Sequence, residues 1–503
     1  MSCGAAGTSQ ILGQASKEAG LRLAETRRIF HWVKEQEGER LRDEGLDPNA
    51  GLDAEAAEAW LMRQQYQATG TPSLHLTGRF AERAVMIEEG RSKVTLAEVA
   101  AMKVLPGYLA VRRAGQCPIC ERFTGSAASH QCPTRDSMTR IPGGAWPAGP
   151  VAAATWWESL SAEEKTRAIE LDPVKIGNLD GIPAAVRNKV NRETLASELA
   201  TWMRVTEAAD AGKPHPLLDQ LQPGYRAQFV ADAKVRLEML ESVKSALGKA
   251  TNRKLLVLST EFPGKAAIAI GDIDTADDVA ILVPGMNGWV TETMGKHTLS
   301  AVRVERESRV CSFRLEDKRK AAVVAWVGYY APNKIQVPFR GQAEQGAEAL
   351  RDFTMGVRAQ RAVRGKPVHL TVVGHSYGSV VTGLASRVGL ESDDVVLVGS
   401  PGVTVRKASA LRVPEGHVWT ADAQNDLVAG LGWFGQRPTA RVFGAQVLST
   451  DASPDTLFGG ELRASNGHSD YYSHRTTALR NIALVVCGRP DQALLDRQRS
   501  QAV

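Results

Sequence analysis

The spacing of apolar residues divides the chain into helical stretches, which come first, and a later region where short strands alternate with helices. In residues 1–114, apolar side chains recur at helical spacing, for example at Ile29, Phe30 and Val33. This spacing predicts amphipathic helices. Such helices more often pack against their own protein than against another one, and a protein partner for this region is the alternative.

A second helical stretch is predicted for residues 151–253. Ser161, followed three residues later by Glu164, matches a capping box and indicates a helix start. Residues 225–247 form a long helical pattern that begins after Pro223-Gly224. We expect this stretch to be a helical leader of the region that follows.

Residues 254–503 are predicted to form an α/β domain. Several short segments are apolar at nearly every position, as expected for strands that helices cover on both faces. Their alternation with helical patterns predicts a mostly parallel, doubly wound sheet. The predicted strands are residues 255–258, 267–270, 279–283, 321–327, 369–373, 395–398, 418–420 and 440–443, and the clearest helices between them are 342–362 and 379–388.

The composition is that of a folded globular protein and excludes several classes of function. Of the 503 residues, 43% are hydrophobic and 23% are charged, which argues against a disordered chain. The net charge of +5 comes without a dense cluster of Lys and Arg, so we expect no nucleic-acid partner. No apolar run reaches the roughly 18–20 residues that span a bilayer, which predicts that there is no transmembrane segment.

The N-terminal stretch and the cysteine pattern bear on where the protein is located. The stretch from Met1 to Leu12 lacks the basic and apolar regions of a signal peptide. The six cysteines do not form the pattern of a small secreted disulfide framework. We therefore expect a cytoplasmic protein, with signal-independent export or a phage particle as the alternatives.

Residues 115–150 combine a cysteine cluster with a Pro- and Gly-rich run that marks a linker. Cys117 and Cys120 are followed by His130 and Cys132. Three thiolates and one imidazole are a common ligand set for structural zinc, so we predict that these four residues bind Zn²⁺. A redox Cys-x-x-Cys motif is one alternative, although its usual strand and helix context is missing, and loosely placed thiols are another.

The motif with the clearest chemistry is Gly374-His375-Ser376-Tyr377-Gly378, which follows the apolar pair Val372-Val373 and precedes a helical pattern. Gly-x-Ser-x-Gly between a strand and a helix is typical of a nucleophile elbow, a sharp turn that exposes the serine oxygen. We predict that Ser376 is a nucleophile and that the Tyr377 N–H, at the start of the helix, stabilises an oxyanion. His375 is expected to point away from the serine oxygen and to pack under the edge of the sheet.

A nucleophilic serine needs a histidine base and a carboxylate that orients it, and in such a site the acid precedes the histidine along the chain. His468 lies in a loop before the last predicted helix and is favoured as the base over His474. His417 borders a predicted strand and is expected to be structural.

Two aspartates are candidates for the acid, because Asp422 and Asp426 both follow a predicted strand. Asp426 is favoured because the apolar pair Leu427-Val428 would fix its loop against the body of the protein. The second oxyanion donor is expected from the loop after residues 279–283. There Gly285 allows close approach of the backbone, and the Met286 N–H is the candidate donor.

Several segments together resemble an actinobacterial α/β-hydrolase family of unknown function that is related to serine-esterase and cutinase-like lineages. The resemblance runs from about residue 151 to residue 488, about two-thirds of the chain. It implies the α/β-hydrolase fold and a Ser-Asp-His hydrolase, without a substrate. One departure is Asp426-Leu427-Val428, where the family commonly has Asp-Pro before Ile or Val. The matching segments are Trp156-Trp157 with Leu160, residues 176–184 with Arg187, Asn191 and Arg192, residues 283–286, residues 326–329 with Ala331-Pro332, residues 374–379, residues 399–402, and His468-Ser469 with Tyr472.

These features predict a serine hydrolase of the esterase or lipase type that cleaves a carboxylic ester through an acyl-enzyme. Ser376, Asp426 and His468 would be catalytic, and catalysis would need no cofactor. Small or lipidic esters are the expected substrates. The alternative is a phage or effector-type protein whose N-terminal part docks to a partner. Its hydrolase domain would then act on an envelope lipid or serve only as a binding scaffold.

Overall fold

The computed structural model describes residues 141–219, 223–248, 250–260, 264–286, 288–331, 341–429 and 432–496. The predicted helices of residues 1–114 and the predicted zinc ligands, Cys117 to Cys132, lie outside the described residues. The chain divides into two compact units. The larger contains residues 136–198, 239–260 and 264–503, and the described part of the smaller contains residues 199–219 and 223–238. The predicted boundary at residue 253 stays a prediction.

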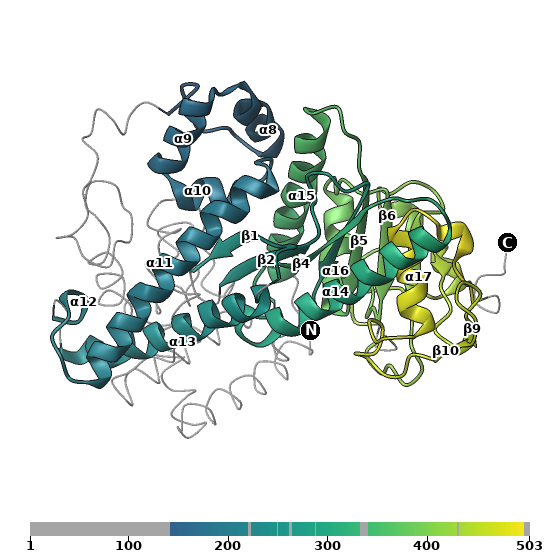
Figure 1. Cartoon of the computed structure of the whole chain (residues 1–503). Coiled ribbons are helices and arrows are strands. Elements are labelled where there is room, and N and C mark those ends of the chain that lie inside the picture. The colour runs from purple at the N-terminus through teal and green to yellow at the C-terminus, as the bar shows by residue number, and fades with distance from the viewer. Residues whose placement is uncertain are drawn as a thin grey trace, which may run out of the picture. The chain divides into compact units, whose positions relative to one another are not determined.

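The larger unit is built on an eight-stranded sheet with the order β1-β2-β4-β3-β5-β6-β7-β8 (Figure 1). All neighbours from β4 to β8 pair in parallel, whereas β1 and β2 are antiparallel. The predicted mostly parallel sheet is therefore confirmed. The strands are β1 (Arg253–Ser259), β2 (Lys265–Ile270), β3 (Asp278–Val283), β4 (Ala321–Val327), β5 (His369–His375), β6 (Asp394–Val398), β7 (Val418–Ala421) and β8 (Gln446–Val447).

One predicted strand is wrong. Residues 440–443 do not join the sheet, because Arg441–Phe443 form a short 3₁₀ helix, η2, and the last strand of the eight-stranded sheet is β8 instead. Val442 is 69% exposed, so the run does not bury its apolar side chains as a strand of this sheet would. Gly444 follows in the left-handed conformation and ends the turn. A run of a few apolar residues is too short for periodicity to separate a strand from a helical turn.

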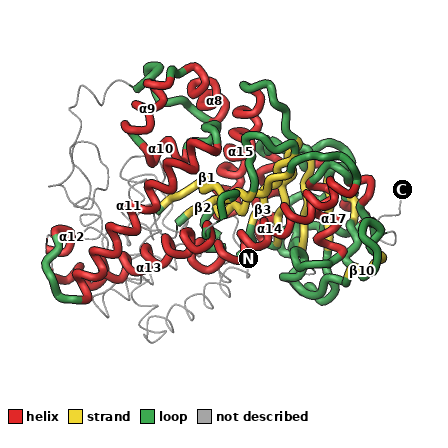
Figure 2. The backbone as a smooth tube through the Cα atoms, viewed as in Figure 1, coloured by secondary structure: helices red, strands yellow, loops and turns green. Residues whose placement is uncertain are grey.

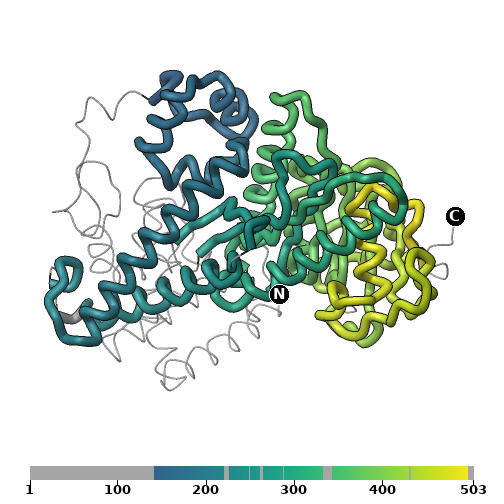
Figure 3. The backbone as a smooth tube through the Cα atoms, viewed as in Figure 1, coloured from purple at the N-terminus to yellow at the C-terminus, as the bar shows by residue number. Residues whose placement is uncertain are grey.

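Helices pack on both faces of this sheet. In Figure 2 the strands form a yellow band with α14 and α15 on opposite sides. Helix α15 packs with α8 and α16, while α14 packs with α17, and Figure 3 shows the yellow C-terminal segment beside α14. All positions of β3, β4 and β6 are buried as a result, which explains their continuous apolar runs. The helices are α8 (Pro150–Ser159), α9 (Ala162–Leu171), α10 (Pro173–Asn178), α14 (Val290–Arg314), α15 (Gly341–Ala362), α16 (Tyr377–Arg387) and α17 (Thr477–Val486).

The local helix predictions are largely confirmed. Ser161 caps α9, where its side chain accepts from the Glu164 N–H and its own N–H donates to the Glu164 carboxylate. Helix α15 begins within one residue of its predicted start. The sequence did not reveal α14, because its apolar residues are widely spaced among Arg, Glu, Ser and Thr.

The smaller unit is helical where it is described. It contains the second part of α11 (Ala184–Asp210), α12 (Pro216–Asp219) and the first part of α13 (Pro223–Leu247). The Trp202 ring lies 6.0 Å from that of Phe229, and the Arg236 guanidinium stacks 4.5 Å from the Trp202 ring. No helix in the described ranges is long and apolar enough to cross a membrane.

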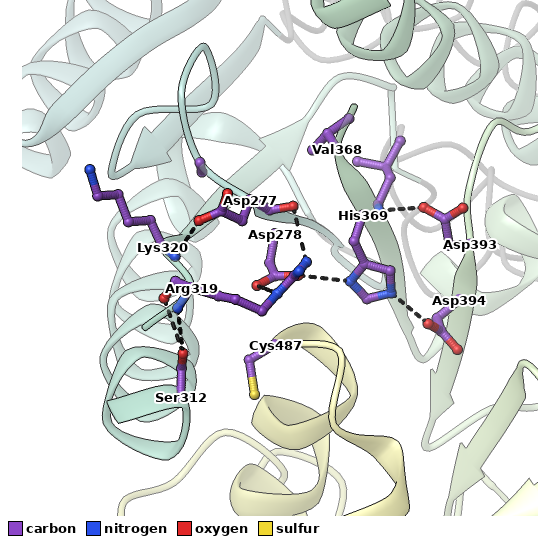
Figure 4. Close-up of polar contacts among 12 residues, drawn as sticks. Asp277, Asp278, Ser312, Arg319, Lys320, Val368, His369, Asp393, Asp394 and Cys487 are labelled. Carbon is purple, nitrogen blue, oxygen red and sulfur yellow. Dashed lines mark hydrogen bonds and ion pairs between the residues drawn. The ribbon is translucent and has the colours of Figure 1, made fainter. Parts of the chain in front are cut away.

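A cluster of charged side chains around buried Asp278 and Asp394 joins the amino ends of the central strands (Figure 4). His369, at the start of β5, lies between two carboxylates, with Nδ1 3.1 Å from Asp278 and Nε2 2.8 Å from Asp394. Arg319 also binds Asp278, at 2.9 Å through Nε. Burial alone lowers the pKa of His369, but the hydrogen bonds to the two carboxylates outweigh burial and raise the pKa to about 9. His369 is therefore an imidazolium at neutral pH.

We expect His369→Gln to destabilise the protein at pH 6.5 and to have much less effect above pH 9. Because the folded pKa is raised, the imidazolium contributes most below its unfolded pKa near 6.5, and the contribution is lost as the pH rises through about 9. A shift of this size corresponds to about 3 kcal/mol of unfolding free energy. Urea unfolding of both proteins from pH 6 to 10 measures the difference.

His417→Gln serves as the comparison, since His417 Nδ1 also contacts Asp394, at 2.8 Å, but its side chain is 43% exposed. Its substitution should cost less than that of His369. The difference in unfolding free energy between wild type and His369→Gln should shrink between pH 6.5 and 9. A difference that stays constant would contradict the charged state assigned to His369.

Candidate active site

The predicted nucleophile lies at a strained turn between β5 and α16. Ser376 has φ 56° and ψ −128°, a conformation that residues with a side chain rarely adopt. Its N–H donates to the Val398 carbonyl of the neighbouring strand β6, at 3.0 Å, which holds the turn at the carboxyl edge of the sheet. The side chain is almost fully buried. This is the geometry of the predicted elbow.

Both glycines of the motif are required, because neighbouring atoms lie too close to leave room for a side chain. A Cβ at Gly378 would collide with the Val283 carbonyl oxygen and would lie 2.5 Å from that of Pro284. A Cβ at Gly374 would lie 2.7 Å from Thr382 Oγ1. The elbow therefore packs directly against the end of β3, where the second predicted oxyanion loop begins.

That oxyanion loop touches the nucleophile. A Cβ at Gly285 would lie 3.0 Å from Ser376 Oγ, so the backbone beside Met286 approaches the serine closely. On the other side, Tyr377 is the first residue of α16, and the first N–H groups of a helix have no partner within the helix. The two predicted donor residues thus belong to segments that flank Ser376.

Two buried side chains hold the end of β3 and the start of this loop, and the sequence alone did not reveal the role of either. Tyr329 donates its hydroxyl to the Pro284 carbonyl at 2.7 Å. His297, on α14, lies with Nε2 2.8 Å from the Leu282 carbonyl. Burial lowers the pKa of His297 to about 4, so the ring is neutral and donates this hydrogen bond.

The predicted base and acid are paired. His468 Nδ1 lies 2.9 Å from Asp426 Oδ1 and 3.0 Å from Oδ2. A Cβ at Gly399, which directly follows β6, would lie 2.7 Å from Asp426 Oδ2 and 3.2 Å from His468 Cε1. Since β6 neighbours β5, the pair and Ser376 share one edge of the sheet. Ser376 Oγ and His468 do not hydrogen-bond to each other in the described structure, and such bonds often tighten only when substrate binds.

Asp426 is held by more than the histidine. The Tyr471 hydroxyl donates to Oδ2 at 2.6 Å, and the N–H groups of Val428 and Ala429 donate to Oδ1. Burial raises the pKa of Asp426, but the hydrogen bonds from His468 and Tyr471 prevail and lower it to about 2. The carboxylate is therefore ionised at neutral pH, as an acid that orients an imidazole must be.

The reason given for favouring Asp426 is wrong. Leu427 is 83% exposed, so the apolar pair that follows Asp426 does not fix the loop against the body of the protein. Backbone N–H groups and the buried Tyr471 do so instead. The family resemblance included Tyr472 and not Tyr471, so the sequence pointed to the neighbour of the residue that binds Asp426.

The alternative residues lie elsewhere. Asp422 is bound to Arg437 at 2.7 Å and to Thr439 at 2.5 Å, and no hydrogen bond in the described ranges joins it to His468. His474 is exposed and precedes α17. His417 contacts Asp394 at the amino edge of the sheet, in keeping with its expected structural role. Within the described ranges, no group of three or more His, Cys, Asp or Glu side chains could hold a metal ion.

Comparison with known proteins agrees with this architecture. Residues 261–435, which include the elbow and Asp426, match the family model described as alpha/beta hydrolase. Over 383 residues the chain is 28% identical to uncharacterised protein Rv2079 of Mycobacterium tuberculosis, with 69% of this chain and 57% of the relative covered. The chain thus spans just over half the length of that relative.

A shorter relative is covered more completely. Uncharacterised protein Rv0963c of M. tuberculosis is 33% identical over 240 residues, which is 44% of this chain and 88% of the relative. Uncharacterised protein Mb0988c of Mycobacterium bovis matches to the same extent. With the parallel sheet and the elbow in place, these matches show that the chain belongs to the α/β-hydrolase family.

Proposed function

We propose that the protein is a serine hydrolase that cleaves a carboxylic ester through an acyl-enzyme. The observation that carries the proposal is the pairing of buried Asp426 with partly buried His468 at the same sheet edge as the strained Ser376. A nucleophile, a base and an orienting carboxylate in the chain order Ser, Asp, His are what acyl transfer requires in this fold.

In the proposed mechanism, His468 Nε2 takes the proton of Ser376 as the serine oxygen attacks the ester carbonyl. The Asp426 carboxylate stabilises the imidazolium and keeps the proton on Nδ1. The negative oxygen of the tetrahedral intermediate accepts hydrogen bonds from the N–H groups of Tyr377 and Met286. His468 then protonates the leaving alcohol, and later it deprotonates the water that releases the acid.

Ester substrates, small or lipidic, are favoured because an alcohol is an easier leaving group than an amine. No step uses a metal. Zinc binding by Cys117, Cys120, His130 and Cys132 stays a separate prediction about the structure of the N-terminal region.

A fluorophosphonate probe tests the proposal, because such probes phosphonylate only an activated serine. We expect wild type to be labelled on the peptide that contains Ser376 and to hydrolyse p-nitrophenyl esters. Asp426→Asn should slow both by about 10²- to 10⁴-fold, because the amide no longer selects the correct imidazole tautomer. Asp422→Asn is the matched control, since Asp422 is as buried but pairs with Arg437.

Three results would count against the proposal. A folded wild type that neither reacts with the probe nor hydrolyses esters would favour a binding scaffold. Labelling at another serine would displace Ser376. A larger loss in Asp422→Asn than in Asp426→Asn, with thermal midpoints near that of wild type, would transfer the role of the acid to Asp422.

A further inference from the structure

His375, the residue before the nucleophile, contacts the segment that carries the proposed base. Its Nε2 lies 2.8 Å from the His468 carbonyl oxygen. The two imidazole rings lie 4.7 Å apart with an angle of 34° between their planes. The rings of Tyr471 and Tyr472 lie 5.8 and 6.1 Å from that of His375. His375 therefore packs against this loop, not merely under the edge of the sheet as the sequence predicted.

His375 is neutral and donates this hydrogen bond. Burial, together with the nearby His468 and His297, lowers the pKa of His375 to about 4. At neutral pH the ring is neutral and, because a carbonyl can only accept, Nε2 carries the proton. A neutral ring can remain packed against His468 when His468 becomes an imidazolium during catalysis, whereas a second cation would repel it.

The carbonyl that His375 binds belongs to a loop without regular secondary structure. On the N-terminal side of His468, the Gly467 N–H donates to the Gln424 carbonyl at 2.6 Å. On the C-terminal side, Asp470 forms a two-pronged ion pair with Arg463, at 2.6 and 2.9 Å. His375, which is adjacent to Ser376 in the chain, contacts His468 itself. It therefore links the backbone that holds the nucleophile to the backbone that holds the base.

We propose that His375 is a positioning residue that holds His468 in register with Ser376. Asp426 binds the His468 ring at Nδ1 and His375 binds the His468 backbone carbonyl, so the side chain and the backbone of His468 are each held at one point and Nε2 keeps one direction. This inference rests on the proposed function, in which that Nε2 takes the serine proton. It assigns no direct contact with substrate to His375.

His375→Phe and His375→Gln separate the hydrogen bond from the packing. Phenylalanine keeps a flat ring against His468 but has no donor, whereas glutamine can place an N–H near the position of Nε2. We expect His375→Phe to lower kcat and the rate of fluorophosphonate labelling by about 10- to 100-fold, since a shift of about 1 Å in a catalytic group can cost that much. KM should change less than about threefold, and His375→Gln should recover most of the rate.

The fraction of protein labelled at completion distinguishes positioning from misfolding. A positioning defect lowers the rate but leaves the final fraction equal to that of wild type, whereas a structural defect lowers the final fraction and the thermal midpoint. Tyr472→Phe is the matched control, because its hydroxyl is buried and makes no hydrogen bond to any described residue. Its labelling rate should equal that of wild type.

Two outcomes would overturn the inference while leaving the proposed function intact. They are a wild-type labelling rate in His375→Phe, or an equal defect in His375→Phe and His375→Gln. A wild type that is not labelled at all would instead overturn the proposed function, and this inference with it.

Discussion

Replacing Ser376 with alanine is expected to abolish fluorophosphonate labelling and to lower kcat for ester hydrolysis by about 10⁴-fold or more. Alanine removes the oxygen that forms the acyl-enzyme but leaves the rest of the site in place. It also keeps a Cβ, so the strained backbone at φ 56° and ψ −128° is unchanged. The thermal midpoint should therefore stay close to that of wild type, and the loss of activity can be assigned to the missing hydroxyl.

Ser376→Gly is the companion variant, because it removes the same oxygen and also the strain. Glycine adopts this conformation at little cost, so we expect Ser376→Gly to be more stable than Ser376→Ala by about 1–2 kcal/mol. Urea unfolding of the two inactive variants measures this difference. Equal stability would mean that the turn stores no strain at Ser376, and residual labelling in either variant would mean that another serine reacts.

The second large effect is expected for His468→Ala, which should lower kcat and the rate of labelling by about 10⁴-fold or more. Without the imidazole, the site loses the group that takes the serine proton in the proposed mechanism. The fold should persist, because Asp426 keeps hydrogen bonds from Tyr471 and from two backbone N–H groups. Active-site labelling over a long time course, together with kcat on a p-nitrophenyl ester, gives both measurements.

His474→Ala provides the matched control, since His474 was the competing base and lies six residues further along the chain. It is exposed, and we expect its kcat to stay within about twofold of wild type. A loss in His474→Ala comparable to that in His468→Ala would show that the loop rearranges to bring His474 to the serine, and the assignment of the base would then be wrong.

Local patterns were sufficient for most strands of the larger unit, although not for β8 or for helix α14. Apolar runs such as residues 279–283 and 321–327 could be recognised because helices on both faces bury every position of β3 and β4. The capping box at Ser161 was recognisable because both of its hydrogen bonds join residues three apart. The elbow could be predicted for the same reason, since one turn of chain contains the strand end, the serine and both glycines.

Choosing between similar candidate residues depended on contacts between segments that are distant in the sequence. Asp422 and Asp426 follow the same strand, but only the folded loops show Arg437 binding the first while His468 and Tyr471 bind the second. The paths of such loops follow from tertiary packing, which periodicity does not describe. For the same reason the sequence did not reveal that His375 binds the His468 carbonyl, a contact between residues 93 positions apart.

The sequence by itself thus determined the fold class, the position of the elbow and Ser376 within it, because each depends on side-chain types at short, regular spacing. Only the tertiary structure decided which aspartate meets which histidine, how Tyr471 and His375 hold them, and that His369 joins Asp278 to Asp394 at the other edge of the sheet. That last cluster exists because β5 pairs with β3 on one side and β6 on the other, an order that the chain alone does not reveal.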